Sequence, residues 1–170
     1  VKPGKLTVCG EKIDLGKVQE NVADEARTQR AMIHLLMGDV SDARPLADGT
    51  ELSRHQDARS RAMMTAVIGE AWARSGQAKK ALDTLSIIDP EDPEYDALKP
   101  QLYRAFAYAY AHSNDLKGMK RCVRRLADID LRLLGGFMAK RAHPLLQKEA
   151  KQTLERSGQL PRKMMVQRGL

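Results

Sequence analysis

Apolar residues recur at helical spacing along most of the chain, and the first fourteen residues are the exception. Residues 1–14 show no helical period, so we expect an extended N-terminal arm, either a short strand or a tail. From Leu15 to Met37 the apolar residues fall every three or four positions, as in an amphipathic helix. Gly38 ends this helix, because glycine readily adopts the left-handed conformation that follows a helix.

Proline, glycine and capping residues divide the rest of the chain into shorter segments. Thr50 can cap a helix that ends at Ser75, because a threonine hydroxyl accepts a hydrogen bond from an unpaired first-turn N–H. Pro90 prevents the next helix from continuing, and Gly135 with Gly136 interrupts the chain further on. After Gly38 we expect a short segment at 39–46, helices at 50–75, 77–88, 100–112, 115–127 and 144–156, and a mobile basic tail at 159–170.

An internal period of 38 residues organises the middle of the chain. Glycine or asparagine recurs where the chain must turn, since both tolerate positive φ, and small residues recur where two helices must approach closely. The matched sets are Gly38, Gly76 and Asn114; Ala31, Gly69 and Ala107; Ala43, Ala81 and Met119; and His34, Trp72 and Tyr110. A fixed period of this size indicates stacked units that cannot bury their apolar faces alone.

The residues that recur with this period also form a pattern known from a protein family. The middle unit has Ile68, Gly69, Trp72, Gly76, Ala81, Leu85, Ile88 and Pro93, and the third has Phe106, Ala107, Tyr110, Asn114, Met119, Val123 and Leu126. This pattern resembles the tetratricopeptide repeat (TPR) over roughly residues 24–130, although the family's usual period is about 34 residues. The first unit keeps Ala31, Gly38 and Ala43 but has Arg30 and His34 where the family has apolar residues. The resemblance implies an all-α fold over 15–158, with antiparallel helix hairpins stacked into a solenoid and the helix 144–156 as its cap.

The resemblance also implies a concave groove and assigns residues to it. The groove residues it implies are Met63, Glu70, Arg74, Gln101, Arg104, Tyr108 and His112. Such a mixture of polar, charged and aromatic side chains is suited to binding an extended peptide or a helix. One subtype of the family holds chaperone tails with a Lys/Asn/Arg clamp, and the matching positions here, Thr28, Met32, Val67, Gln101 and Ala105, lack that set. We therefore do not expect this chain to bind chaperone tails.

Positive charge is concentrated in the last third of the chain. Residues 116–170 contain 14 Lys and Arg against 4 Asp and Glu, whereas residues 1–115 contain 15 against 18. The expected basic surface comprises Lys117, Lys120, Arg121, Arg124, Arg125, Arg132, Lys140, Arg141, Arg162 and Lys163. It is either a solvated face or a docking surface for RNA, an acidic protein or an anionic membrane.

Residues that carry chemistry are sparse. The four histidines do not form a zinc-binding spacing with cysteine or with each other, and phosphate-binding glycine loops and catalytic triads are absent. The acidic residues between 89 and 96 surround two prolines and suggest a solvated loop. We expect no enzymatic activity, no cofactor and no bound metal.

Composition favours a globular chain, with 42% hydrophobic and 30% charged residues. The two cysteines, Cys9 and Cys122, are expected to be reduced thiols in a cytoplasmic protein. No apolar run is long enough to span a membrane. The chain begins at Val1 rather than Met, which leaves open a preceding segment.

Together these features predict a non-catalytic protein–protein interaction module, such as an adaptor, scaffold or assembly factor, that holds a partner peptide or helix in its groove. The alternative is a factor associated with RNA or ribonucleoprotein that acts through the basic last third of the chain.

Overall fold

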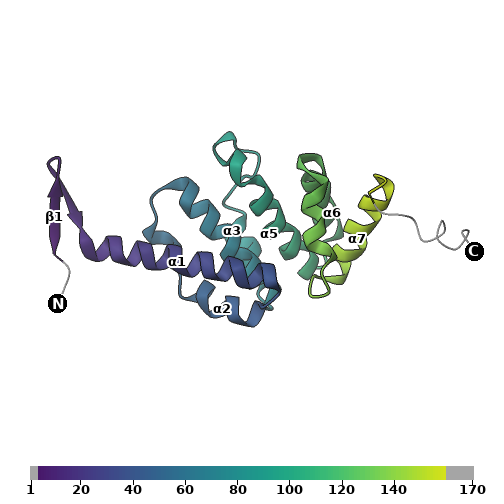
Figure 1. The fold of residues 1–170 in the computed structure, drawn as a ribbon, viewed down its shortest axis with the longest axis horizontal. Helices are drawn as coiled ribbons and strands as arrows, with labels where there is room; N and C mark the ends of the chain where they lie inside the picture. Colours follow the sequence, from purple (N-terminus) through teal and green to yellow (C-terminus); the bar gives the residue numbers. More distant parts are fainter. Residues whose placement is uncertain (1–3, 160–170) are drawn as a thin grey trace, which may run out of the picture.

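The computed structural model describes residues 4–159, and most of this part is helical (Figure 1). The expectation of an all-α fold is confirmed. The elements are β1 (Lys5–Val8), β2 (Glu11–Asp14), α1 (Leu15–Met37), α2 (Val40–Asp48), α3 (Ala58–Arg74), α4 (Ala78–Leu85), α5 (Lys99–His112), α6 (Leu116–Ile129) and α7 (Pro144–Arg156), with 3₁₀ helices η1 (Leu52–Arg54), η2 (Pro93–Leu98) and η3 (Leu131–Met138).

The N-terminal residues form a β-hairpin that projects from the helical body (Figure 1). Strands β1 and β2 pair antiparallel, with Lys5 opposite Asp14. Cys9 and Gly10 make the turn with φ values of 50° and 82°, the left-handed geometry that a two-residue hairpin turn requires. Asp14 then caps α1 by accepting a hydrogen bond from the Gly16 backbone N–H at 3.0 Å. Of the two expectations for this arm, the strand is therefore the right one.

The turns that close α1, α3 and α5 share one geometry. Gly38, Gly76 and Asn114 have φ values of 83°, 89° and 57°. In each turn the following backbone N–H donates to a carbonyl five residues back: Asp39 to His34 at 2.8 Å, Gln77 to Trp72 at 2.8 Å, and Asp115 to Tyr110 at 2.9 Å. These are Schellman-type helix ends. The 38-residue period of the sequence is thus a period of helix termination as well.

The small residues of the period lie where helices meet. The positions Ala31, Gly69, Ala107, Ala43, Ala81 and Met119 are all buried. A Cβ added at Gly69 would lie 2.9 Å from Leu85 Cγ, which shows how closely α3 and α4 approach. Along the chain each of these helices packs on the next, and α3 also contacts α1 and α5. The hydrophobic core is therefore continuous from α1 to α7.

The start of α3 differs from the sequence expectation. Thr50 does not cap it; its hydroxyl instead donates to the Leu46 carbonyl at 2.9 Å, after the end of α2. Asp57 is the cap, and its carboxylate accepts from the Ser60 backbone N–H at 2.9 Å. The helix consequently begins at Ala58, and residues 50–57 form a loop containing η1. Threonine and aspartate are both good caps, and propensity alone does not rank them at this point.

A buried carboxylate fixes that loop against α1. Asp24 is fully buried and lies 2.9 Å from His55 Nε2 and 2.9 Å from Arg27 Nη1. Arg54 adds a contact of 3.3 Å from its Nη2. Because the partners come from α1 and from the loop, this cluster anchors the loop to the first helix.

Candidate partner-binding groove

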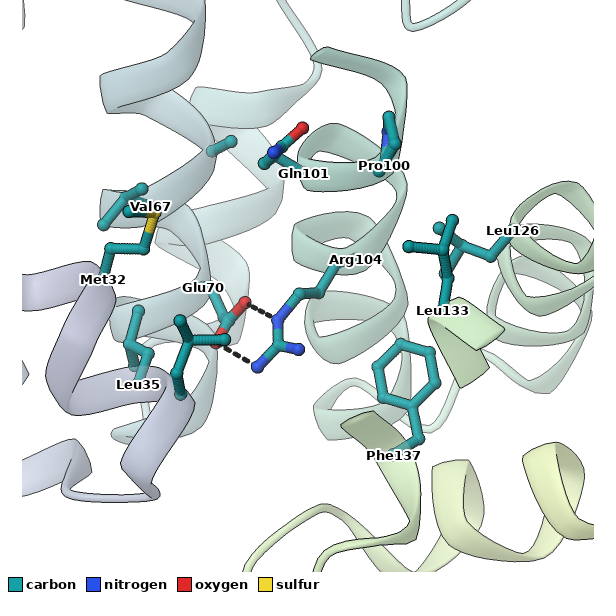
Figure 2. Close-up of a pocket in the computed structure, with 12 residues that line it drawn as sticks. Met32, Leu35, Val67, Glu70, Pro100, Gln101, Arg104, Leu126, Leu133 and Phe137 are labelled. Atoms are coloured by element: carbon teal, nitrogen blue, oxygen red, sulfur yellow. Dashed lines mark hydrogen bonds and ion pairs between the residues drawn. The ribbon is translucent and has the colours of Figure 1, made fainter. Parts of the chain in front are cut away.

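A groove opens between α1, α3 and α5, and we name it the central groove (Figure 2). Its cavity volume is about 210 Å³. Residues Leu126 of α6 and Leu133 and Phe137 of η3 close one side of it. The complete lining is Met32, Leu35, Leu36, Ala66, Val67, Glu70, Pro100, Gln101, Arg104, Leu126, Leu133 and Phe137. Most of these side chains are apolar, so the central groove is suited to an apolar side chain.

Glu70, which lines the central groove, forms ion pairs with two arginines. Glu70 Oε1 accepts a hydrogen bond from Arg104 Nε at 2.6 Å, and Glu70 Oε2 accepts from Arg74 Nη1 at 2.9 Å (Figure 2 shows the Arg104 contacts). Burial alone would lower the pKa of Arg104, but the Glu70 carboxylate outweighs it and raises that pKa. Two guanidinium groups therefore share one carboxylate, and one positive charge remains uncompensated there.

Tyr108, which the family resemblance assigns to the groove, lies beneath these arginines. Its side chain is only 1% exposed. The Arg74 and Arg104 guanidinium carbons lie 4.5 and 5.5 Å from the Tyr108 ring centre, and the Phe137 ring meets it edge-on at 5.5 Å. The cause is η3, which folds back over α5 and covers this position. Tyr108 supports the two arginines as a cation–π platform.

A second cavity continues from the central groove, and we name it the basic end. It shares Leu35, Leu36 and Arg104 with the central groove. Its other charged lining residues are Arg74, Lys140 and Arg141. Arg141 reaches across to the turn after α1, where its Nη1 lies 2.8 Å from Asp39 Oδ1. The segment between η3 and α7 thus forms one wall of the basic end, opposite α1.

The structure separates two of the remaining expected groove residues from the others. Met63 lines a different depression, between α1 and the start of α3. His112 is partly exposed at the end of α5, and its ring packs edge-on against His143, with 4.6 Å between ring centres. The other five lie together: Glu70, Gln101 and Arg104 line the central groove, and Arg74 and Tyr108 line the basic end.

Sequence reasoning missed the contributions of α1 and η3. Leu35 and Leu36 are adjacent apolar residues, and their side chains point about 100° apart around the helix, so one of them lies at the edge of the apolar face. Leu36 is 65% exposed at the rim. Nothing in the sequence around Phe137 indicates that η3 returns to α5, because that contact depends on how the chain after α6 folds back.

The expected basic surface is divided in the structure. Helix α6 exposes Lys117, Lys120, Arg121, Arg124 and Arg125. Several cations are partly neutralised: Arg125 lies 3.4 Å from Glu91, Arg132 lies 2.7 Å from Asp130, and Arg141 pairs with Asp39. Lys140 and Arg141 belong to the basic end rather than to α6. Arg162 and Lys163, with the tail from residue 160, lie outside the described residues.

One group of metal-ligating side chains occurs in the described residues. Ligand atoms of His34, Asp39 and Asp42 lie within 4.8 Å of one another. In the sequence, His34 occupies a position where the family has apolar residues, and no bound metal is expected. The Arg141 guanidinium already pairs with Asp39, so a dication would have to compete with that positive charge.

Comparisons of the chain with protein-family models, with curated proteins and with solved structures found no match. Among the helices of residues 4–159, none combines the length and apolar character that crossing a membrane requires.

Proposed function

We propose that this chain is a TPR-like α-solenoid that acts as a non-catalytic protein–protein interaction module and holds a partner segment in the central groove. The repeated helix ends at Gly38, Gly76 and Asn114 support the solenoid, since they recur at the sequence period. Stacked hairpins of this kind generate extended concave surfaces that bind other proteins.

The observation that carries the proposal is unburied apolar surface beside the central groove. Three apolar residues of the last two turns of α1, Ile33, Leu36 and Met37, are 53%, 65% and 67% exposed. Contiguous exposed apolar side chains next to a cavity are characteristic of interaction sites. The cavity of about 210 Å³ is smaller than the roughly 300–1,000 Å³ of small-molecule sites. It is instead suited to one large apolar side chain that anchors a longer segment.

Peptide display with a matched pair of variants tests this proposal. Leu36→Asp places a charge at the rim of the central groove, while Ile87→Asp places the same charge at a site that is 84% exposed and lines none of the described cavities. Both positions are exposed, so both variants should fold. We expect the immobilised wild-type chain and Ile87→Asp to enrich a common set of apolar 12-residue peptides, and Leu36→Asp to bind them at least about tenfold more weakly.

Equal binding of the enriched peptides by the Leu36→Asp and Ile87→Asp variants contradicts the proposal, as does failure of the wild-type chain to enrich any sequence. Circular dichroism of each variant at the assay temperature verifies that the helices are intact.

The RNA-associated alternative is favoured by the five exposed cations on α6. A phosphate-binding face loses affinity steeply between about 50 and 200 mM salt. The paired charge reversal Lys120→Glu with Arg124→Glu should then abolish binding to a single-stranded RNA oligonucleotide, whereas Leu36→Asp should leave it unchanged. RNA binding that survives the paired reversal rules out this face.

A further inference from the structure

We infer that the segment held by this chain carries an acidic side chain close to its apolar anchor, and that this carboxylate binds in the basic end. The inference rests on the proposed function, because it assigns a chemistry to the partner of the same groove. Two features support it: the balance of charge around the two connected cavities, and an open approach to one guanidinium.

Positive charge exceeds negative charge around the connected cavities. Their lining includes four cations, Arg74, Arg104, Lys140 and Arg141, against the single carboxylate of Glu70. Asp39, which pairs with Arg141, and Asp42, whose carboxylate lies within 4.8 Å of Asp39, add two negative charges nearby. Cations still outnumber carboxylates by one, so the basic end attracts an anionic group.

The four cations differ in their freedom to bind a ligand. The Arg74 side chain is only 4% exposed and is occupied by Glu70 and by the Leu35 carbonyl, to which it donates at 3.0 Å. Arg141 is occupied by Asp39. Lys140 is exposed, and no carboxylate in residues 4–159 pairs with it. Lys140 is therefore the cation most available to a partner.

Arg104 offers the partner carboxylate a second contact, through its Nη1 atom beside Gly136. Its Nε and Nη2 atoms face Glu70, at 2.6 and 3.4 Å. Its Nη1 atom faces Gly136 of η3, where an added Cβ would lie 2.9 Å away. Arg104 and Gly136 both line the basic end, and Gly136 has no side chain to lie between the Nη1 atom and the cavity. A carboxylate there would be charge-assisted by Arg104 and Lys140 together.

The two cavities adjoin each other, and this sets the order of the partner's groups. Leu36 and Arg104 line both cavities. One segment can therefore place an apolar side chain against Met32 and Val67 and extend its next residues past Arg104. The acidic residue thus lies beside the anchor along the segment. A nucleic acid would supply the negative charge but would leave the apolar central groove empty.

The test uses three synthetic 12-residue peptides with identical leucines, in which the flanking positions are all Glu, all Gln or all Lys. Affinities are measured by calorimetry with the whole chain at 50 and 150 mM NaCl. We expect the Glu peptide to bind about tenfold more tightly than the Gln peptide, and the Lys peptide to bind most weakly. The preference should shrink at the higher salt concentration.

Two matched pairs of variants localise the effect. Lys140→Glu should remove the preference for the Glu peptide, whereas Lys117→Glu, on the exposed face of α6, should retain it. Gly136→Ala should weaken binding of the Glu peptide and leave binding of the Gln peptide unchanged, because the added Cβ lies against Arg104 Nη1. Gly135→Ala, which meets no atom within 4 Å, should change neither.

Failure of the inference and failure of the proposed function give different results. If all three peptides bind equally and Leu36→Asp still abolishes binding, the central groove is real and the acidic preference is wrong. If no peptide binds, the proposed function itself fails. Self-association that Leu36→Asp abolishes, detected by sedimentation, makes a second copy the occupant and overturns the inference. RNA binding that is lost in Lys140→Glu overturns it as well.

Discussion

The close approach of α3 and α4 at Gly69 gives a stability prediction with an unusual sign. At an open helical site, replacing glycine by alanine stabilises a protein by about 1 kcal/mol. In Gly69→Ala the new methyl would lie 2.9 Å from Leu85 Cγ and 3.0 Å from both of its methyl groups. Favourable carbon–carbon contact is at about 3.5–4.0 Å. Leu85 is fully buried and cannot move into solvent to relieve the clash.

Overpacking of a tight core costs about 1–3 kcal/mol, and a cost of about 2 kcal/mol at this contact exceeds the helix-propensity gain of about 1 kcal/mol. We therefore expect Gly69→Ala to lower the free energy of unfolding by about 1 kcal/mol. In a Leu85→Ala background the obstruction is gone, and the same substitution should raise it by about 1 kcal/mol. The sign reversal corresponds to a coupling of about 2 kcal/mol between the two positions, within the range for residues in contact.

Urea unfolding followed by circular dichroism measures these differences through the midpoint, provided that the slope is unchanged. Gly135→Ala serves as the control, because its Cβ meets nothing within 4 Å. If Gly69→Ala stabilises the wild-type chain, or if its effect is the same with and without Leu85, the proposed steric contact between these helices is refuted.

Two further predictions concern charged groups. Glu70→Gln should lower stability by about 3 kcal/mol, because Arg74 and Arg104 lose their shared counter-ion in a buried site; a change below about 1 kcal/mol in urea unfolding contradicts this. Burial lowers the pKa of His143, and partial burial with the neighbouring imidazole lowers the pKa of His112 to about 4. Both groups therefore favour the fold above their ordinary pKa of about 6.5, and that contribution is lost as pH falls towards 4. His143→Asn retains an N-cap side chain for α7, and its melting temperature should fall less between pH 7.5 and 5 than that of the wild-type chain; an equal fall counts against a role for the histidine pair.

Local sequence patterns were sufficient to predict the turns that end α1, α3 and α5 and the close helix contacts. Gly38, Gly76 and Asn114 turn with positive φ as their residue types require. Ala81 and Ala107 are fully buried where the period placed them. These features depend on backbone conformation and side-chain size at single positions, and both can be read directly from a sequence.

Features that depend on distant partners could not be predicted in the same way. The burial of Asp24 has no local signal, because its partner His55 lies 31 residues further along the chain. The candidate site was predicted in part: Glu70 and Arg104 lie in the central groove, but η3 buries Tyr108. The family resemblance covers roughly residues 24–130 and predicts positions within them. It gives no information about η3, which follows them.

The contact between Arg141 and Asp39 joins positions 102 residues apart in the sequence. In an array whose neighbours touch only each other, the terminal units fray independently and folding can begin anywhere. Here an ion pair joins the turn after α1 to the segment before α7, and the loop-closure entropy of the intervening chain must be overcome before the contact forms. The Arg141 side chain is 68% exposed, so the pair contributes at most about 1 kcal/mol, and amide hydrogen exchange should show only weak coupling between these two segments.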